Sequence, residues 1–350
     1  MATKLKLPSN PLIAPGATIL ITGANGLIAS HVVDQFLAAG YKVRGTVRDP
    51  AKCEWMTSLF AARHPSSQLE LIEIADFAAP GNWNQAVKGV AGVASIAGSV
   101  GLDVQDIGAA LDKELPWLEV LLQAAKDEPS VKAFIYTSSG MAAWKADPKK
   151  KVKLGYDSYN EDAIRIGLGN GSPSEKGIFP YMGFKAVLEQ KLWDWVKREN
   201  PSYTFNTILP NTVCGQCLDP KGQGIPSTNA FVKALFDGQS LDVLKYLVPQ
   251  WQSDTRDLGA LYVAALITPG VDRERLYAFS DRHSWPRVAQ ILKELYPQRN
   301  IPILEDDGWD QTDVPNQRGR DLLRGLGLKG WTTLEESVKA CAESCLELEG

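Results

Sequence analysis

The sequence predicts an α/β fold, in which a doubly wound parallel sheet is followed by a smaller, mostly helical domain. Three observations lead to this class. Short β-rich apolar runs alternate with segments of helical period through the first two-thirds of the 350-residue chain. The connections between them are short, which favours right-handed crossovers and a parallel sheet covered by helices on both faces. From about Cys214 onward the alternation becomes irregular, with more Pro and Trp.

The first predicted unit is a strand, a helix and a strand. Residues 17–21 form a short apolar run rich in β-branched residues, which predicts a strand. Residues 26–39 carry apolar side chains at helical spacing, and Gly40 ends that pattern. Residues 41–47 alternate between polar and apolar side chains, which predicts the second strand.

The second predicted unit repeats this order. Residues 50–63 predict a helix whose large apolar side chains share one face, and residues 69–74 predict a strand that ends just before Asp76. A short helix over 83–88 then leads to a buried strand over 90–97.

The last predicted elements of the sheet domain are longer. A long helix over 104–126 precedes a strand over 131–138. A strongly amphipathic helix over 179–199 leads to a strand over 203–209, which we expect to be the sixth and last of the series.

Composition and charge exclude several classes of protein. The net charge of -4 offers no basic face to nucleic acid or to anionic lipid. Neither a long apolar span nor an apolar leader is present, which predicts a soluble, cytoplasmic protein. Five cysteines indicate a reducing compartment. Cys214 and Cys217 match the C-x-x-C pattern without a second pair at zinc spacing, so we favour packing over a redox or metal role and expect no metal site.

A glycine turn joins the first strand to the first helix, where residues 22–26 read TGANG. Glycine at Gly23 and Gly26 lets backbone amides approach a pyrophosphate, and the helix N-terminus adds partial positive charge. Ala29 stands where a third glycine is often found, because helix and strand pack closely there. This strand, turn and helix near the start of the chain indicate a Rossmann-type dinucleotide site. The expected contacts are Gly23, Asn25, Gly26, Leu27 and Ile28.

The change of pattern at about Cys214 suggests how the chain is divided. We expect a dinucleotide-binding domain over residues 12–213 and a substrate-binding domain over residues 214–350. Part of the segment 240–280 is expected to pack back onto the first domain.

The end of the second strand discriminates between the two nicotinamide dinucleotides. NAD sites usually place an acidic residue there to hold the ribose 2′-hydroxyl. Here Arg48, with Lys52 one turn into the next helix, would neutralise a 2′-phosphate, which favours NADP(H). Two alternatives remain: Arg48 is merely exposed, and the neighbouring Asp49 caps the helix that begins at Pro50.

Three side chains suggest the chemistry. Ser139 follows the strand over 131–138, at the carboxyl edge where ligands bind in such sheets. Tyr181 and Lys185 are four residues apart on the amphipathic helix, so the phenol and the ammonium share one face. A neighbouring cation is expected to lower the pKa of a phenol toward neutrality, as a general acid or base requires. The Ser139 hydroxyl would hold a substrate carbonyl against that phenol.

These residues carry a family resemblance. The matching stretches are TGANGLIASHVV, GYKVRGTVRD, VKGVAGVASIAG, VKAFIYTSS, YMGFK and ILPNTVCG, with weaker matches in DTRDLGALYVAAL and LGLKGWTTLEESVK. Together they run from about residue 12 to residue 340. The chain resembles the extended branch of the short-chain dehydrogenase/reductase superfamily. Within it, the chain most resembles the yeast and fungal carbonyl (aldehyde) reductases, which are related to plant dihydroflavonol reductase.

The resemblance implies reduction of an aldehyde or ketone by NADPH. Tyr181 would be the proton donor, Ser139 would orient the carbonyl, and Lys185 would lower the tyrosine pKa and bind the nicotinamide ribose. The implied partner is a small-molecule carbonyl substrate, with the chain acting as a monomer or homodimer. The other implied cofactor contacts are Arg48 and Lys52 at the 2′-phosphate, Asp76 and Phe77 at the adenine, Pro210, Asn211 and Val213 at the nicotinamide, Ser227 at the pyrophosphate, and Ala97 and Thr137.

The chain departs from the family pattern around the expected substrate cavity. Phe184 replaces a frequent serine, and Ser95 stands where a histidine is frequent. The segment 140–178 follows its own path, and we expect Trp144 and Trp251 to line the cavity. The identity of the substrate is therefore not carried over from the family.

Two other functions compete with the reductase. A nucleotide-sugar epimerase or dehydratase would keep the fold but retain NAD as a bound group, which the Arg48 site disfavours. A non-catalytic dinucleotide sensor tends to lose the tyrosine–lysine pair, and here both residues are present. His31, inside the first helix, is expected to serve packing rather than catalysis.

Overall fold

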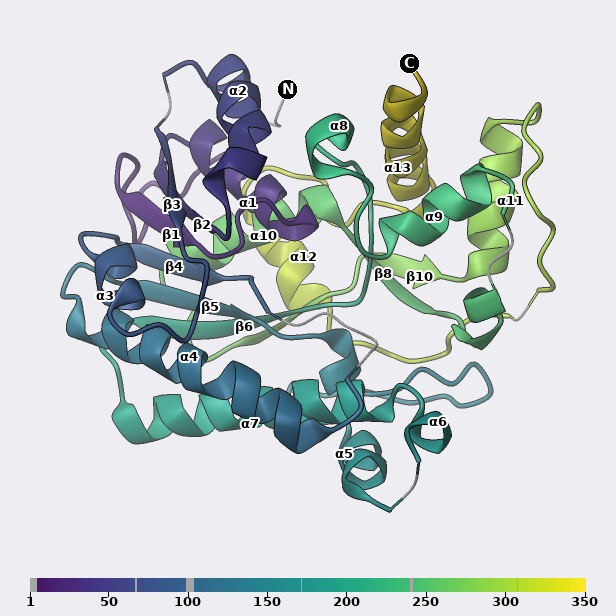
Figure 1. Ribbon diagram of the computed structural model, residues 1–350, viewed down its shortest axis with the longest axis horizontal. Coiled ribbons are helices and arrows are strands. Elements are labelled where there is room, and N and C mark those ends of the chain that lie inside the picture. The colour runs from purple at the N-terminus through teal and green to yellow at the C-terminus, as the bar shows by residue number, and fades with distance from the viewer. Residues whose placement is uncertain (1–4, 67, 99–103, 171, 240–241, 307) are drawn as a thin grey trace.

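The structure is a computed structural model that describes residues 5–66, 68–98, 104–170, 172–239, 242–306 and 308–350. Its centre is a seven-stranded sheet, in which all neighbouring strands are parallel, in the order β3-β2-β1-β4-β5-β6-β9 (Figure 1). The strands of this sheet are β1 (Thr18–Ile21), β2 (Lys42–Val47), β3 (Leu69–Glu73), β4 (Gly92–Ser95), β5 (Ala133–Thr137), β6 (Thr204–Pro210) and β9 (Arg275–Ala278).

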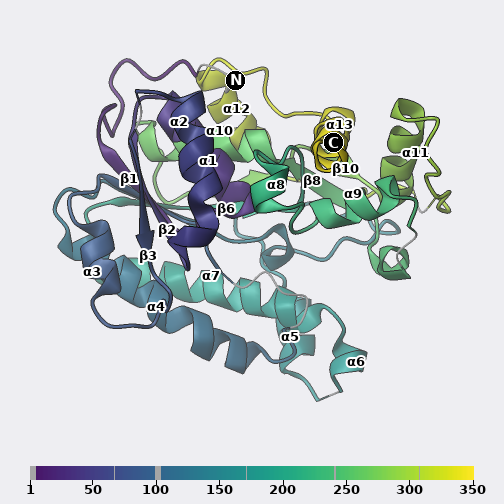
Figure 2. The same cartoon turned by 45° about the horizontal axis from the view of Figure 1, so that its top comes forward.

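Helices cover both faces of this sheet, which confirms the predicted α/β class. One face packs against α1, α2, α10 and α12, and the other against α3, α4 and α7 (Figure 2). Helices on both sides explain why β4, β5 and β6 are almost continuously buried rather than alternating. The bounds are α1 (Leu27–Ala38), α2 (Glu54–Arg63), α3 (Asn82–Val87), α4 (Ile107–Asp127), α7 (Phe179–Glu199), α10 (Thr255–Ile267) and α12 (Gln317–Gly325).

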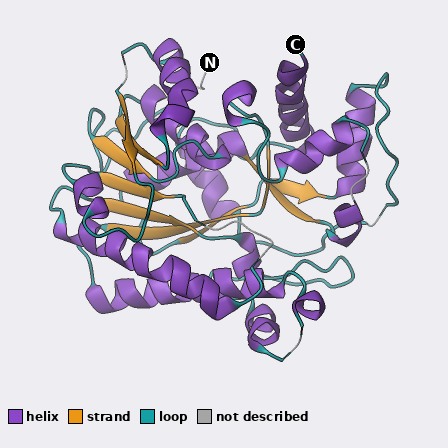
Figure 3. Cartoon of the chain, viewed as in Figure 1, coloured by secondary structure: helices purple, strands orange, loops and turns teal. Residues whose placement is uncertain are grey.

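A second, three-stranded sheet lies in the C-terminal part (Figure 3). Its central strand β8 (Gln250–Asp254) pairs in parallel with β7 (Thr212–Cys214) and antiparallel with β10 (Asp281–His283). A hydrophobic cluster beside it joins α9, α11 and α13. The remaining bounds are α5 (Glu161–Leu168), α6 (Pro173–Lys176), α8 (Pro220–Gln223), α9 (Asn229–Phe236), α11 (Trp285–Leu295), α13 (Leu334–Glu349), η1 (Pro50–Cys53), η2 (Gly140–Ala142) and η3 (Asp242–Tyr246).

The main sheet has one strand more than the six that the sequence predicts. The structure adds β9 to the edge of the sheet beside β6, and α10 packs against α1. The four residues of β9 read RLYA, so a charged side chain stands in a buried strand and hides the apolar pattern. The predicted helix over 50–63 also begins as a short 3₁₀ turn, η1, before α2. The amphipathic helix is α7, and both of its predicted ends are confirmed.

Candidate active site

The turn between β1 and α1 is open to a phosphate. Gly23 has a φ of +63°, and a Cβ atom there would lie 3.1 Å from the Cβ atom of Ala97. Gly26 is the N-cap of α1, and no side chain caps that helix. Its first backbone N–H groups are therefore free of side-chain acceptors and face the position that an anion would take. The Thr22 hydroxyl accepts the backbone N–H of Ala97 at 2.9 Å and so holds the end of β4 against the turn.

The other predicted residues of this turn differ in exposure. Asn25 is exposed, Ile28 is half-buried and Leu27 is buried in the layer between α1 and the sheet. Gln223 in α8, which the sequence did not point to, donates a hydrogen bond of 3.0 Å to the Asn25 carbonyl. Ser227, in the loop after α8, is exposed and has a φ of +59°.

The residues after β2 fit a 2′-phosphate site. Arg48 is exposed, and Lys52 is exposed and pairs with Asp49 at 3.3 Å. The Asp49 carboxylate caps η1 by accepting the backbone N–H of Ala51 at 3.1 Å, so the capping alternative is also correct. The guanidinium of Arg48 has no ion pair within the described part of the chain, which leaves it accessible to a ligand phosphate.

The two predicted adenine contacts, Asp76 and Phe77, differ in exposure. Asp76 is exposed beyond β3 and accepts the backbone N–H of Ala78 at 2.9 Å. The ring of Phe77 packs between two tryptophans, with ring centroids 4.7 Å from Trp117 and 5.3 Å from Trp83. Its half-buried side chain thus packs against the hydrophobic layer under the sheet.

Ser139 and Tyr181 meet beyond the carboxyl end of β5, and Lys185 follows one turn further along α7. Ser139 is the N-cap of η2 and half-buried, and its hydroxyl accepts the backbone N–H of Met141 at 3.2 Å. Tyr181 and Lys185 lie in the first two turns of α7, with exposed fractions of 8% and 6%. The Ser139 side chain interacts with the Tyr181 phenol, and the Lys185 ammonium lies 5.7 Å from the ring centroid of Tyr136.

Burial controls the charge of both ionisable groups. It raises the pKa of the Tyr181 phenol to about 12, which the interaction with Ser139 partly offsets. This direction is opposite to the expected one, because loss of solvent around a phenolate outweighs the other influences. Burial lowers the pKa of Lys185 to about 8, while the carboxylates of Glu114 and Glu189 act in the opposite direction. At neutral pH the site therefore holds a protonated phenol beside a mostly protonated amine.

The end of β6 supplies an unpaired amide at the same edge. Pro210 and Val213 are buried, and both amide atoms of the Asn211 side chain are buried without a hydrogen-bond partner among the described residues. Such groups are rare in folded proteins unless a ligand or water satisfies them. Together with the uncapped glycine turn, this amide fits a bound dinucleotide whose nicotinamide also carries an amide.

The predicted contact Thr137 is held between two elements. Its hydroxyl donates to the Ser95 carbonyl at 2.8 Å and lies 2.5 Å from the Tyr262 hydroxyl of α10. Ser95, which replaces a frequent histidine, is fully buried, and its own hydroxyl lacks a partner among the residues described. The sequence did not indicate that Tyr262 contacts Thr137, because Tyr262 lies on α10 in the C-terminal half of the chain.

A buried carboxylate behind Ser139 was also missed. Glu189 accepts hydrogen bonds from Arg275 Nε at 2.8 Å and from Ser138 Oγ at 2.7 Å. The only local signal is its spacing, since Tyr181, Lys185 and Glu189 recur every four residues along α7.

The region expected to bind substrate is aromatic. Trp144 and Trp251 are both buried in one cluster around Phe279, with ring centroids 5.4 and 6.1 Å from it. A Cβ atom at Gly140, next to Ser139, would lie 2.7 Å from the Phe279 ring. The cluster therefore begins directly beside Ser139. Phe184 lies elsewhere, in the layer between α7 and the sheet.

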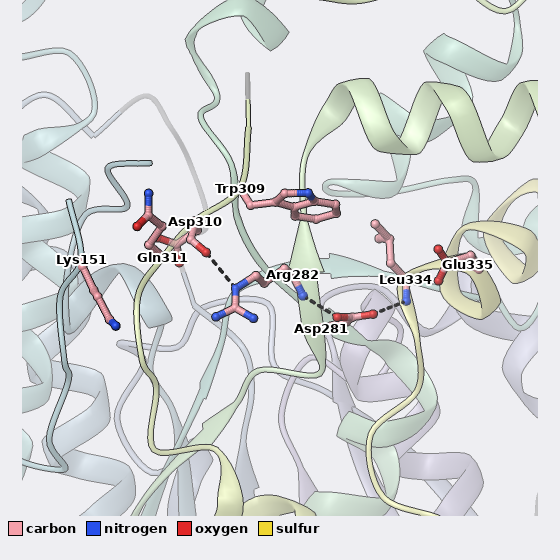
Figure 4. Close-up of a pocket in the computed structure, with 8 residues that line it drawn as sticks. All are labelled: Lys151, Asp281, Arg282, Trp309, Asp310, Gln311, Leu334 and Glu335. Atoms are coloured by element: carbon pink, nitrogen blue, oxygen red, sulfur yellow. Dashed lines mark hydrogen bonds between the residues drawn. The ribbon is translucent and has the colours of Figure 1, made fainter. Parts of the chain in front are cut away.

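Beyond this cluster lies a pocket of about 600 Å³ between β10, the start of α13 and the loop before α12 (Figure 4). Arg282 covers the outer face of Trp251, at 4.8 Å from the ring centroid, and donates to the Asp310 carbonyl at 2.8 Å. The pocket is lined by Lys151, Asp281, Arg282, Trp309, Asp310, Gln311, Leu334 and Glu335.

All five cysteines are buried and unpaired. Cys214 and Cys217 lie near Cys341 and Cys345 of α13, and contact with Cys214 and Cys345 raises the pKa of Cys341.

His31 is buried, and its Nε2 lies 2.9 Å from the Gln216 carbonyl, which agrees with a packing role.

None of the helices in the described part of the chain is both long and apolar enough to cross a membrane. Within the same part of the chain, no group of three or more His, Cys, Asp or Glu side chains is arranged to hold a metal ion.

The chain is similar to several known proteins. A model of the NmrA-like family matches residues 15–159. The chain is 32% identical over 340 residues to Aldehyde reductase 2 of Sporidiobolus salmonicolor, covering 94% of this chain and 96% of that protein. It is 31% identical over 341 residues to the NAD-dependent epimerase/dehydratase terH of Aspergillus terreus, covering 96% and 99%.

Among solved structures, the fold is similar to that of yeast methylglyoxal/isovaleraldehyde reductase Gre2 complexed with NADPH. The TM-score is 0.79 and the sequence identity 21%, and the match covers 95% of this chain and 99% of that one. This likeness shows that the two chains share the whole architecture.

Proposed function

Since the chain belongs to the extended short-chain dehydrogenase/reductase family, as its motifs predict and its match to a fungal aldehyde reductase shows, we propose that it reduces an aldehyde or ketone to an alcohol with NADPH. One observation carries this proposal. The side chains of Ser139 and Tyr181 meet at the carboxyl edge of the sheet, and Lys185 lies one turn further along α7.

The cofactor has matching features along the same edge. The uncapped turn at Gly23 and Gly26 holds the pyrophosphate, and Arg48 with Lys52 binds the 2′-phosphate. The unpaired amide of Asn211 hydrogen-bonds the nicotinamide. When bound, NADPH supplies the hydride that the carbonyl carbon receives.

The protein's own residues act on the carbonyl oxygen. Ser139 donates its hydroxyl hydrogen to that oxygen and fixes the orientation of the carbonyl. As negative charge develops on the oxygen, Tyr181 transfers its phenolic proton to it, and the product alcohol forms. The pKa of about 12 keeps this phenol protonated before each turnover. Lys185 stabilises the phenolate left behind, which regains its proton from solvent.

The proposal is tested by following NADPH oxidation at 340 nm with a panel of aldehydes, α-keto esters and aryl ketones. Tyr181→Phe removes only the phenolic hydroxyl, so it should lower kcat by about 10²- to 10⁴-fold. The affinity for NADPH, measured by fluorescence titration, should stay nearly unchanged. Turnover equal to wild type would exclude Tyr181 as proton donor, and no turnover of any carbonyl by wild type would contradict the reductase itself.

One similar protein carries the name epimerase/dehydratase, which favours a second candidate on the same fold. Such an enzyme would retain NAD through purification. Mass spectrometry of the desalted protein decides between the two: NAD that survives desalting supports the alternative, whereas protein that loses its dinucleotide on desalting and then binds added NADPH supports the reductase.

Three further assignments accompany the reductase. Residues 12–213 form the dinucleotide-binding domain and 214–350 the substrate domain, with β9 and α10 of the second part packed onto the first. The enzyme acts in the cytoplasm on a small-molecule carbonyl substrate. It works as a monomer or homodimer, which light scattering of the purified protein decides.

A further inference from the structure

A buried ion pair lies directly behind the candidate active site. Glu189 is fully buried and Arg275 nearly so, and the guanidinium approaches both carboxylate oxygens, at 2.8 and 3.0 Å. The same carboxylate accepts hydrogen bonds from the hydroxyl of Ser138 at 2.7 Å, from the hydroxyl of Thr207 at 2.9 Å and from the indole of Trp193 at 3.3 Å.

This carboxylate joins elements that are distant in sequence. Glu189 belongs to α7, Ser138 follows β5, Thr207 lies in β6 and Arg275 opens β9. The other end of the guanidinium donates to the carbonyls of residues 156 and 158 at 2.8 Å each, inside the divergent segment 140–178. One charged pair therefore fixes the catalytic helix, the end of the serine-bearing strand and the loop that leads toward the substrate region.

We propose that Glu189 is a positioning residue for the reduction: through Ser138 it sets where Ser139 meets Tyr181, and from its place one turn beyond Lys185 on α7 it acts on that side chain. The inference rests on the proposed reductase function. Ser138 and Ser139 are neighbours in the chain, so the hydrogen bond at Ser138 fixes the backbone from which the Ser139 hydroxyl points.

Stability alone does not explain such a pair. Desolvating two charges costs about as much as their attraction returns, and apolar residues of similar size are often equally stable. The network also lies close to the candidate catalytic groups, because Tyr181, Lys185 and Glu189 recur every four residues along α7.

The charges around Lys185 support the second half of the proposal. Glu189 faces it from its own helix, Glu114 from α4 and the Tyr136 ring from β5. Burial lowers the pKa of Lys185, and both carboxylates raise it. Two phenols, those of Tyr181 and Tyr262, also lie near Tyr136. Burial raises the pKa of each phenol, so both are neutral at pH 7. Without the Glu189 charge, Lys185 would lose its proton at lower pH.

The first experiment compares variants of two serines that flank β5, Ser138 after its end and Ser130 before its start. Ser138→Ala deletes the hydrogen bond to Glu189 without changing any charge, and it should lower kcat about tenfold with little change in the KM for NADPH. Ser130 precedes β5 at its opposite end and also donates to a glutamate, Glu128, at 2.6 Å. Ser130→Ala should leave kcat within about twofold of wild type. Equal kcat in wild type and Ser138→Ala would overturn the positioning of Ser139.

The second experiment changes the charge. Glu189→Gln should move the alkaline limb of the kcat profile to lower pH, because Lys185 deprotonates earlier. Glu274 forms a bidentate pair with Arg318 beside β9, and Glu274→Gln is the control that should leave the profile unchanged. Where Glu189→Gln does not fold, Glu189→Leu combined with Arg275→Met removes both charges and keeps the volume. An alkaline limb that stays in place would overturn the role at Lys185.

Two readouts do not depend on turnover. The pKa of Lys185, measured by NMR of isotopically labelled lysine and assigned with Lys185→Arg, should fall in Glu189→Gln. A crystal structure of Ser138→Ala should show the Ser139 hydroxyl displaced from Tyr181. If wild type reduces no carbonyl, the reductase proposal fails, and these two measurements still decide the positioning role: an unchanged pKa and an undisplaced hydroxyl would overturn it.

Discussion

Replacing Lys185 by methionine should make the cofactor-free protein more stable at pH 7 while removing most of its activity. Burial lowers the pKa of this amine from the ordinary 10.5 to about 8. That difference of about 2.5, at 1.36 kcal/mol for each pKa unit, corresponds to about 3 kcal/mol by which folding disfavours the charged form. Methionine fills similar space without a charge. The pKa of about 8 already includes the attraction of Lys185 to Glu114 and Glu189, so we expect a net gain of about 3 kcal/mol.

The pH dependence identifies the cause. The pKa of the folded state lies below that of the unfolded state, so the penalty is fully present below about pH 8 and disappears above 10.5. With a pKa of about 8 in the folded state and 10.5 in the unfolded state, this penalty on folding is about 3.3 kcal/mol at pH 7 and about 1.4 kcal/mol at pH 9.5. The advantage of Lys185→Met should therefore shrink by about 2 kcal/mol between these two pH values.

Urea unfolding of both proteins at pH 7 and pH 9.5 measures this directly. Lys191 lies on the same helix but is exposed, so Lys191→Met should change the free energy of unfolding by less than about 0.5 kcal/mol. The reasoning is refuted if Lys185→Met is no more stable than wild type at pH 7, or if its advantage is the same at both pH values.

Three further outcomes are expected. Gly23→Ala should lower the free energy of unfolding by about 1–2 kcal/mol because φ is positive there, and it should weaken NADPH binding at least tenfold. The control is Gly16→Ala, at φ +88° in open space, which should lower stability without affecting NADPH binding. Arg48→Ala should weaken NADPH far more than NADH in fluorescence titrations, and equal weakening would exclude the 2′-phosphate contact. The five buried thiols should react with a thiol reagent only after unfolding, and rapid reaction of the native protein would contradict their burial.

Elements whose signals are local could be predicted from the sequence. The helix α7 matches its predicted bounds because Pro180 starts it and Asn200, at φ +41°, ends it. The strand β9 was missed because Arg275 argues locally against burial. Only Glu189, 86 residues away in the chain, makes a buried arginine tolerable there.

The candidate site divides in the same way. The proximity of Ser139 and Tyr181 followed from spacing and strand order alone. The pKa of Tyr181 did not, because its direction depends on how much solvent the fold removes around the phenol. The packing of Phe77 against Trp83 and Trp117 also escaped prediction, since it requires α3 and α4 to converge under β3 and β4.

Three energetically unfavourable buried groups lie at the carboxyl edge of the sheet. Lys185 is a buried amine, Asn211 carries an unpaired amide and Ser95 an unpaired hydroxyl among the described residues. Each of them costs folding free energy that an apolar side chain would not. A dinucleotide and a carbonyl substrate bring ribose hydroxyls, a carboxamide and a polar oxygen to the same edge, which are the partners that these groups lack. Their cost in the free protein is thus returned as binding free energy, which explains why the sequence keeps them where packing alone would remove them.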